Sequence, residues 1–203
     1  MARSQKLHER TAWIAALAVC LAAAGWAQGG EAPAMSAEEA AAMAAFEKAA
    51  TPGEAHAWLA SLAGEWEFHG NFWMAPGTEA THSMGTAVRE AILGGRVVRE
   101  VVISEMFGQA FEGIGHTGFD NVTGQFWSTW FDNMSTSLMM STGACDGGVC
   151  TFEGTNTDPM TGKAAKARMV SQHEGNREIH EMWGPGPDGA DFKMMELTYT
   201  RKE

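Results

Sequence analysis

Gly64 divides the chain into two parts that differ in how hydrophobic and polar residues are spaced. Two stretches with helical spacing come before it, and short runs rich in β-branched and aromatic residues follow it. We predict strands near residues 65–74, 80–92, 96–106, 109–120, 124–133, 135–144, 149–157, 163–173, 177–184 and 190–201. No stretch of helical length interrupts these runs, which disfavours a parallel β-α-β arrangement. The spacing predicts a mainly β protein, an antiparallel up-and-down β-barrel of about ten strands, because closure removes unpaired strand edges.

Glycine-containing sequences separate the predicted strands. Gly94-Gly95 is typical of a two-residue hairpin. Longer turns are expected at 121–124, 158–162, 174–176 and 184–189. Consecutive short turns favour strands that pair with their neighbours in the sequence.

The predicted strand near 124–133 carries large aromatic side chains on both of its faces. Alternation places Phe126, Ser128, Trp130 and Asp132 on one face and Trp127, Thr129, Phe131 and Asn133 on the other. Such a strand needs a packed interior on one side and a cover on the other. The pattern leaves open which face points inward. An inward face with Trp130 and Asp132 would favour a ligand site, and the other choice would favour a filled interior.

Two helices are expected before the strands. Ser36 followed by Glu39 forms a capping box that begins a helix over 36–50. Thr51 as N-cap and Pro52 in the first turn begin a second helix over 52–63. Its apolar side chains are Trp58, Leu59 and Leu62, which make it a candidate cover for an aromatic face of the sheet.

Residues 1–27 have the composition of a secretory signal peptide. A start with three basic residues precedes an apolar run, and small residues at Gly25 and Ala27 suit cleavage after Ala27. The run is shorter than the about 20 apolar residues that a membrane span needs. We therefore expect a periplasmic or secreted protein with no transmembrane segment after cleavage. A lipid anchor on Cys20 is the alternative, although the preceding Val19 is bulky for such a signal.

The expected organisation follows from these segments. It is a signal peptide over 1–27, a tail with an Ala-rich helix over 28–50, and a single barrel domain with a leading helix over 51–203. The formal net charge of the full chain is −11 at pH 7, and removal of the mostly basic charges of the signal makes the remainder more acidic. This balance argues against nucleic acid or an anionic membrane surface as a partner. The oligomeric state is left open.

Cys145 and Cys150 flank the short sequence Asp-Gly-Gly-Val. In an oxidising compartment such a pair is most simply a disulfide across a hairpin, which stabilises a loop of this size by roughly 2 kcal/mol. A metal site on this pair is a weaker interpretation, because the chain after the signal has no third Cys and no His close in sequence.

Five segments of the chain resemble one bacterial family. They are Pro52-Gly53-Glu54-Ala55-His56-Ala57-Trp58-Leu59-Ala60-Ser61-Leu62-Ala63-Gly64-Glu65-Trp66, Ile92-Leu93-Gly94-Gly95-Arg96, Gly118-Phe119-Asp120-Asn121 through Trp130, Asp158-Pro159-Met160-Thr161-Gly162-Lys163, and Phe192-Lys193-Met194-Met195-Glu196. These segments are similar to the family catalogued as domain of unknown function 1579, over roughly 52–202. The resemblance implies a lipocalin-like or calycin-type barrel and carries over no catalytic residue. The Cys145/Cys150 pair lies outside the family pattern.

Seven residues are candidates for a ligand site inside the barrel. Ligand pockets are mostly apolar with a few placed polar groups, and a buried carboxylate needs a partner such as Arg89 or Arg99. The candidates are Arg89, Glu112, His116, Trp127, Trp130, Asp132 and Glu181. Together with the expected signal peptide, they predict an exported protein that binds a small, largely apolar molecule. Ordinary core packing, a solvated outer face and an ion-pair network without a ligand are the alternatives.

A metal or haem protein is a second hypothesis, and the sequence fixes no cofactor. Six His remain after signal removal: His56, His69, His82, His116, His173 and His180. A barrel can hold haem through one His, and strands could bring His116 and His180 together. The cluster Met134, Met139 and Met140 could bind Cu(I) together with imidazole, although Met is also an ordinary gap-filler in cores.

An enzyme is a third hypothesis. Glu112, Asp132 or Glu181 could act as general acid or base. The sequence has no nucleophile elbow, P-loop or dinucleotide fingerprint. Binding without catalysis is therefore the favoured class.

Overall fold

The computed structural model of the chain describes residues 35–158 and 161–203. The predicted signal peptide and its cleavage site lie outside the described residues. The chain divides into two compact units, one ending at Ala50 and the other running from Thr51 to Glu203. Helix α2 (Ala37–Ala50) belongs to the first unit, and helix α3 (Glu54–Ser61) and all strands given below belong to the second.

Helix α2 begins with the predicted capping box. The Ser36 amide donates to Glu39 Oε2 at 2.8 Å, and the Glu39 amide donates to Ser36 Oγ at 3.2 Å. Two amides that the helix cannot satisfy are thereby paired. The helix has no buried residue, and Met43 and Phe46 on its predicted apolar stripe are 45% and 59% exposed.

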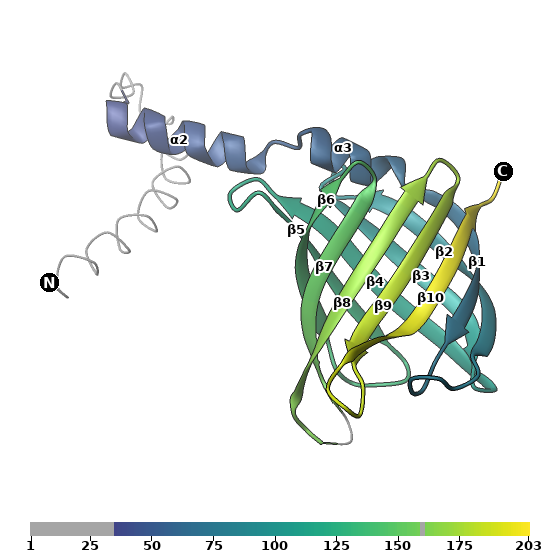
Figure 1. Ribbon diagram of the computed structural model, residues 1–203. Coiled ribbons are helices and arrows are strands. Elements are labelled where there is room, and N and C mark those ends of the chain that lie inside the picture. Colours follow the sequence, from purple (N-terminus) through teal and green to yellow (C-terminus); the bar gives the residue numbers. More distant parts are fainter. Residues whose placement is uncertain (1–34, 159–160) are drawn as a thin grey trace, which may run out of the picture. The chain divides into compact units, whose positions relative to one another are not determined.

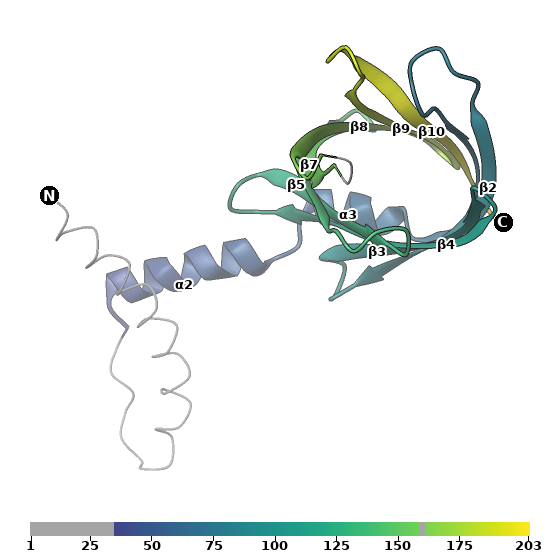
Figure 2. The ribbon, with the colours of Figure 1, turned by 90° about the horizontal axis from the view of Figure 1, so that it is seen from below.

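Ten antiparallel strands form a closed barrel, which confirms the predicted fold class (Figure 1). In chain order they are β1 (Gly64–Phe72), β2 (Thr81–Ile92), β3 (Val97–Met106), β4 (Gln109–Asp120), β5 (Gln125–Asp132), β6 (Met139–Asp146), β7 (Val149–Thr157), β8 (Ala164–Glu174), β9 (Arg177–Pro185) and β10 (Asp191–Arg201). Each strand pairs with the next, and β1 pairs with β10 to close the ring that Figure 2 shows. Strand β6 begins at Met139, later than the predicted start near 135.

The turn between β2 and β3 is wider than the two-residue hairpin that Gly94-Gly95 predicts. Ile92 pairs with Val97, so the loop spans residues 93–96. Leu93, Gly94 and Gly95 all have positive φ, at 52°, 66° and 83°. Glycine adopts a positive φ without the steric cost that Leu93 carries, so Gly94 and Gly95 suit the backbone of this four-residue loop.

Two hydrophobic clusters pack inside the barrel. One consists of Trp66, Phe68, Ala87, Val102, Phe111, Leu197 and Tyr199. The other consists of Leu59, Val98, Phe126, Cys150, Phe152 and Met169. Leu59 comes from α3, so this helix contributes to the interior and is not merely attached to the outside.

Helix α3 covers the end of the barrel at which β1 begins (Figures 1 and 2). Leu59 is 2% exposed, and Trp58 and Leu62 pack half-buried against the same cluster. The helix therefore provides the predicted cover, and it does so as a cap on the end of the barrel. Burial of these three side chains is the main force that holds an eight-residue helix in place, since isolated helices of this length are unstable.

The helix start differs from the one that Thr51 and Pro52 predict. The N-cap is Gly53, and the helix begins at Glu54. The ring of His56 explains the shift: its Nδ1 accepts the Gly53 amide at 3.1 Å, so its Nε2 carries the proton and donates to the Phe119 carbonyl at 3.1 Å. The same side chain thus completes the cap and ties the helix to β4.

The register decides which face of β5 points inward. Phe126 is buried in the interior cluster, so Ser128, Trp130 and Asp132 on the same face also point inward. Trp130 lies on the inner side of β4: a Cβ added to Gly113 would lie 2.3 Å from its ring. Trp127 and Phe131 point outward. The inward face therefore carries Trp130 and Asp132, which is the orientation expected to favour a ligand site.

Candidate functional site

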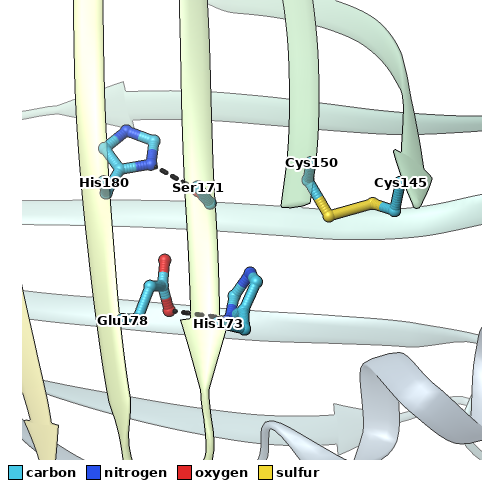
Figure 3. The surroundings of a disulfide bond; sticks show 6 residues. All are labelled: Cys145, Cys150, Ser171, His173, Glu178 and His180. Carbon is cyan, nitrogen blue, oxygen red and sulfur yellow. Dashed lines mark hydrogen bonds and ion pairs between the residues drawn. A yellow bond between two sulfur atoms is a disulfide. The ribbon is translucent and has the colours of Figure 1, made fainter. Parts of the chain in front are cut away.

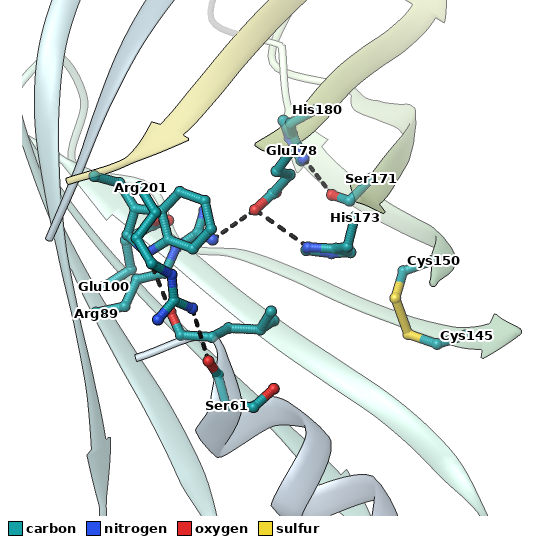
Figure 4. Close-up of polar contacts among 12 residues, drawn as sticks. Ser61, Arg89, Glu100, Cys145, Cys150, Ser171, His173, Glu178, His180 and Arg201 are labelled. Atoms are coloured by element: carbon teal, nitrogen blue, oxygen red, sulfur yellow. Dashed lines mark hydrogen bonds and ion pairs between the residues drawn. A yellow bond between two sulfur atoms is a disulfide. The ribbon is translucent and has the colours of Figure 1, made fainter. Parts of the chain in front are cut away.

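Arg89 on β2 is the centre of a charged cluster inside the barrel, close to α3 (Figure 4). Its Nε donates to Glu100 Oε1 on β3 at 2.7 Å, and its Nη1 donates to Glu178 Oε2 on β9 at 2.5 Å. Arg89 is 8% exposed and the Glu178 side chain 5%. The guanidinium therefore joins carboxylates from β3 and β9, as burial of charge requires.

Aromatic rings enclose the same guanidinium. Arg89 Cζ lies 4.7 Å from the ring of Trp66 and 4.9 Å from that of Tyr199, at cation–π distance. Arg201 lies at 4.7 Å from the ring of Trp66 as well. Its Nη1 and Nη2 donate to the Ala63 and Ser61 carbonyls at the C-terminal end of α3, at 3.0 and 2.7 Å. Arg201 thus links the end-capping helix to the wall of the site.

The charges in the cluster stabilise one another. Burial lowers the pKa of Arg89, but Glu100 and Glu178 outweigh it and raise that pKa above its usual value. Burial likewise raises the pKa of Glu178, but the Arg89 guanidinium outweighs burial and brings that pKa below the ordinary Glu value. Both partners are therefore ionised at neutral pH.

Two histidines complete the polar wall (Figure 3). His173 Nδ1 lies 3.4 Å from Glu178 Oε2 without the geometry of a hydrogen bond, and this nitrogen is buried with no hydrogen-bond partner. His180 Nδ1 lies 2.7 Å from Ser171 Oγ. Burial lowers the pKa of both imidazoles, so they are neutral at pH 7 and can donate and accept hydrogen bonds.

A cavity of about 90 Å³ lies between this cluster and α3. Its polar wall comes from Arg89, Glu100, Thr117, Ser171 and His173. Its apolar wall comes from Trp58, Leu59, Leu62, Val98, Phe152 and the cysteines Cys145 and Cys150. The cavity therefore offers hydrogen-bonding groups on one side and hydrocarbon on the other, which is typical of a site for a small amphipathic molecule.

The cysteines form the predicted disulfide. Cys145 and Cys150 are cross-strand partners in the β6–β7 hairpin, with their Cα atoms 4.0 Å apart. Figure 3 shows the bond beside the strand that carries Ser171 and His173. The disulfide thus contributes to the wall of the cavity as well as closing a hairpin.

The structure separates the seven residues predicted for the site into two groups. Arg89, Trp130 and Asp132 point inward, but Asp132 lies toward the end of the barrel opposite α3, where it accepts the Trp130 Nε1–H at 2.9 Å. The residues that point outward are Glu112, His116, Trp127 and Glu181. Of the seven, Arg89 is the one that lines the interior cavity.

Several residues expected to lie close together do not meet in one site of the structure. His116 lies on the outer face of β4 and His180 on the inner face of β9, so the strands do not bring them together. Met139 points inward, whereas Met134 and Met140 are 45% and 62% exposed. Arg99, expected as a partner for a buried carboxylate, pairs instead with Glu90 on the outside at 2.9 Å.

Sequence reasoning missed Glu100, His173 and Glu178 as members of the site. Counting residues outward from each hairpin turn could have identified them. Arg89 is paired with Glu100 across the β2–β3 turn, and His173 is paired with Glu178 across the β8–β9 turn. Within the described ranges, no group of three His, Cys, Asp or Glu side chains is arranged to hold a metal ion.

The comparisons with known proteins agree with the fold. The model of the family described as "Protein of unknown function (DUF1579)" matches residues 51–201. The chain belongs to this family. Among solved structures, the DUF1579 barrel is similar to Rv2717c from M. tuberculosis, with a TM-score of 0.54 and 14% identity over 75% of this chain and 100% of that chain. At this identity the likeness concerns the fold alone. No curated protein matches the sequence.

The resemblance seen in five segments is thus confirmed as membership of DUF1579, a family of unknown function. The helices of the described residues are too short or too polar to cross a bilayer. At the cavity the interior cluster supplies the Arg89 cation, the Glu100 anion and the neutral His173 imidazole.

Proposed function

We propose that this DUF1579 protein binds a small molecule in the cavity between the Arg89 cluster and α3. The observation that carries the proposal is the composition of the cavity wall. Charged and imidazole groups from β2, β3 and β8 face hydrocarbon from α3 across about 90 Å³. A barrel interior that only had to be filled would need none of these charges, which are costly to bury.

His173 supports the same proposal. Its ring lines the cavity, and its Nδ1 lies 3.4 Å from Glu178 Oε2, so the charged cluster places an imidazole at the cavity wall. A ligand with a hydrogen-bonding group would contact this ring, and its apolar part would lie against Leu59 and Leu62.

The volume of the cavity limits the size of the ligand. A cavity of about 90 Å³ holds roughly three water molecules, and an apolar cavity of about 150 Å³ holds benzene. On this scale the ligand has about four non-hydrogen atoms. It combines one polar group with a compact hydrocarbon part.

The proposal includes export. The composition of residues 1–27 supports a cleaved signal peptide, and the Cys145–Cys150 disulfide is typical of an oxidising compartment. The organisation is then a signal over 1–27, a tail with α2 over 28–50 and the ligand-binding barrel over 51–203. Sequencing the N-terminus of protein from its native host tests this part: a mature chain that still begins at Met1 would contradict it.

Binding is tested with three probes that each have four non-hydrogen atoms and differ in head group. They are propylamine, acetamide and acetic acid, and binding is read from the NMR signal of the Trp58 indole N–H as each is titrated. We expect at least one probe to shift this signal in a saturable way. Native mass spectrometry of the protein from its own host should also show an adduct.

A matched pair of variants locates the probe. Val98→Phe adds volume inside the cavity, and Val88→Phe makes the same change on the outer face of the neighbouring strand, where Val88 is 52% exposed. We expect at least a tenfold loss of affinity for the first and none for the second. If Val98→Phe does not fold, Thr117→Leu serves as the filling variant. Equal binding by filled and unfilled proteins, or no binding and no adduct at all, would overturn the proposal.

A further inference from the structure

A second concave region lies on the outside of the barrel, across β5 to β9. It encloses about 720 Å³ and is open to solvent, within the range of about 300–1,000 Å³ typical of ligand sites. The residues that line it are Trp127, Ser128, Met140, Ser141, Thr142, Glu153, Gly154, Thr155, Lys166, Ala167, Arg168, Trp183, Gly184 and Asp191. We call this region the outer groove.

One row of outward side chains crosses the outer groove from strand to strand. Cross-strand pairing joins Trp127 to Thr142, Thr142 to Glu153, Glu153 to Arg168 and Arg168 to Trp183. The residues that precede them, such as Phe126 and Phe152, are buried in the interior, so this row faces outward. The groove therefore has an indole at each end and hydroxyl and charged groups between them.

The Trp183 end of the groove is held rigidly. Trp183 Nε1 donates to Glu181 Oε2 at 3.2 Å, and Arg168 Cζ lies 5.0 Å from the Trp183 ring centroid. Lys193 lies 5.9 Å from the same ring and bonds Glu181 and Glu196. These contacts fix both the indole and the guanidinium before any ligand arrives, which lowers the entropy cost of binding.

The Trp127 end is fixed by a glycine. The indole lies over Gly118 of β4, where an added Cβ would be 2.3 Å from the ring. Gly118 and Trp127 are directly paired in the register. The missing side chain lets the ring lie close against the strand, so that it forms a platform rather than a mobile projection.

The charged groups of the outer groove keep hydrogen-bonding atoms available for a ligand. Across the described part of the chain, Glu153, Lys166, Arg168 and Asp191 take part in no ion pair and in no side-chain hydrogen bond, and Arg168 also contacts the Trp183 ring. They supply two positive and two negative groups, so the groove has no net charge of its own. A strongly anionic or cationic ligand gains little from such a surface, whereas a neutral ligand with many hydroxyls can both donate and accept.

We propose that the outer groove binds a neutral oligosaccharide. Sugar rings have an apolar face that fits an indole and a rim of hydroxyls that fits paired donors and acceptors, and Trp combines apolar area with a polar tip in the same way. The acidic chain, at −11, disfavours nucleic acid. Strand addition by a peptide needs an unpaired edge, and β5 to β9 are each paired on both sides.

The test titrates maltohexaose, cellohexaose, chitohexaose and a hexapeptide of Ser and Gly against the purified protein. Binding is read from Trp fluorescence and by calorimetry. We expect one hexasaccharide to bind with a Kd of about 1 mM or tighter. Arg168→Gln and Trp127→Ala should each weaken it about tenfold, because stacked and hydrogen-bonding groups dominate small interfaces.

Two controls separate the outer groove from the rest of the molecule. Arg99→Gln removes the same charge from the outer face of β3 and should leave sugar binding unchanged. Val98→Phe fills the interior cavity and should also leave it unchanged. If Trp127→Ala does not fold, Glu153→Gln replaces it. Absence of binding by all three sugars, binding of the peptide alone, or sugar binding that ignores Arg168 would each overturn the proposal.

Discussion

Replacing Arg89 by Met removes the charge that joins both carboxylates of the interior cluster. Arg89 makes two charge-assisted hydrogen bonds, at 2.7 Å to Glu100 and 2.5 Å to Glu178. Such bonds contribute about 1.5–3 kcal/mol each, and breaking a buried ion pair costs about 3–5 kcal/mol because the partner charge is left unpaired. We expect Arg89→Met to lower the free energy of unfolding by about 4 kcal/mol at pH 7.

The pH dependence of this loss distinguishes a buried charge from lost packing. In the wild type, the pKa of Glu178 lies below its ordinary value, so its contribution to stability is present above the pKa of the unfolded chain. That contribution is lost as the pH falls through the folded pKa. Without Arg89, burial dominates and raises the pKa of Glu178. The variant then gains stability relative to the wild type on acidification, by up to about 1.4 kcal/mol per pH unit.

Protonation of His173 and His180 changes how the stability of both proteins depends on pH. Burial lowers the pKa of His173 and His180, so both proteins lose stability as the pH falls below the unfolded His value of about 6.5. Arg89 also lowers the pKa of His173, so its removal makes His173 easier to protonate in the variant. This acts in the same direction as Glu178. The difference between the two proteins therefore shrinks with acid.

The assay is urea unfolding of the wild type and variant at several pH values, with the slope m compared to confirm two-state behaviour. Arg99→Met is the matched control, because Arg99 and Glu90 form an exposed pair on the opposite face of the same hairpin. Its loss should be about 0–1 kcal/mol and independent of pH in this range. A loss for Arg89→Met no larger than the control, or one that does not shrink on acidification, would refute the reasoning.

Three further outcomes test the packing around the site. Gly113→Ala should cost about 1–3 kcal/mol in chemical denaturation, because its Cβ would lie 2.3 Å from the Trp130 ring, whereas Gly115→Ala, with 3.1 Å, should cost less. Reducing the hairpin disulfide should lower the free energy of unfolding by about 2 kcal/mol, and no change with reductant would contradict this. Arg201→Ala should cost about 2 kcal/mol and speed amide hydrogen exchange in α3 while β4 is unchanged.

Hairpin geometry explains how much of the site could be predicted from the sequence. Once the turns at 93–96 and 175–176 are placed, counting outward pairs Arg89 with Glu100 and His173 with Glu178. The disulfide follows from the same arithmetic. The contact between Arg89 and Glu178 does not, because it depends on β1 pairing with β10 and on how far the strands are staggered in the closed ring.

The orientation of β5 shows a different limit. Both of its faces carry aromatic bulk, and β4 offers a glycine opposite an indole on each face. Trp130 lies against Gly113 on the inside, and Trp127 against Gly118 on the outside. Local pattern therefore fits either orientation equally well. Tertiary packing of Phe126 against Phe119 and Trp58 makes the choice, and no sequence period reports it.

The two ends of the barrel interior differ in a way that packing alone does not require. Away from α3, Phe72, Met106, Trp130 and Met195 line the inner face half-buried. The inward carboxylate there, Asp132, accepts from the Trp130 indole and forms no ion pair with the side chains that the structure describes. Beside α3, the chain buries a guanidinium, two carboxylates and two imidazoles. Replacing such a network by neutral groups of similar shape is often neutral for stability, whereas removing one member is not.

Stability and binding can therefore be separated in one protein. The triple variant Arg89→Met, Glu100→Gln, Glu178→Gln leaves no unpaired charge in the cluster, so it should recover most of the stability that Arg89→Met alone loses. If the cluster exists to hold a ligand, titration of this stable variant with propylamine, acetamide or acetic acid should no longer shift the Trp58 signal. If it binds them as the wild type does, the charges serve the fold alone, and the interior site loses its main support.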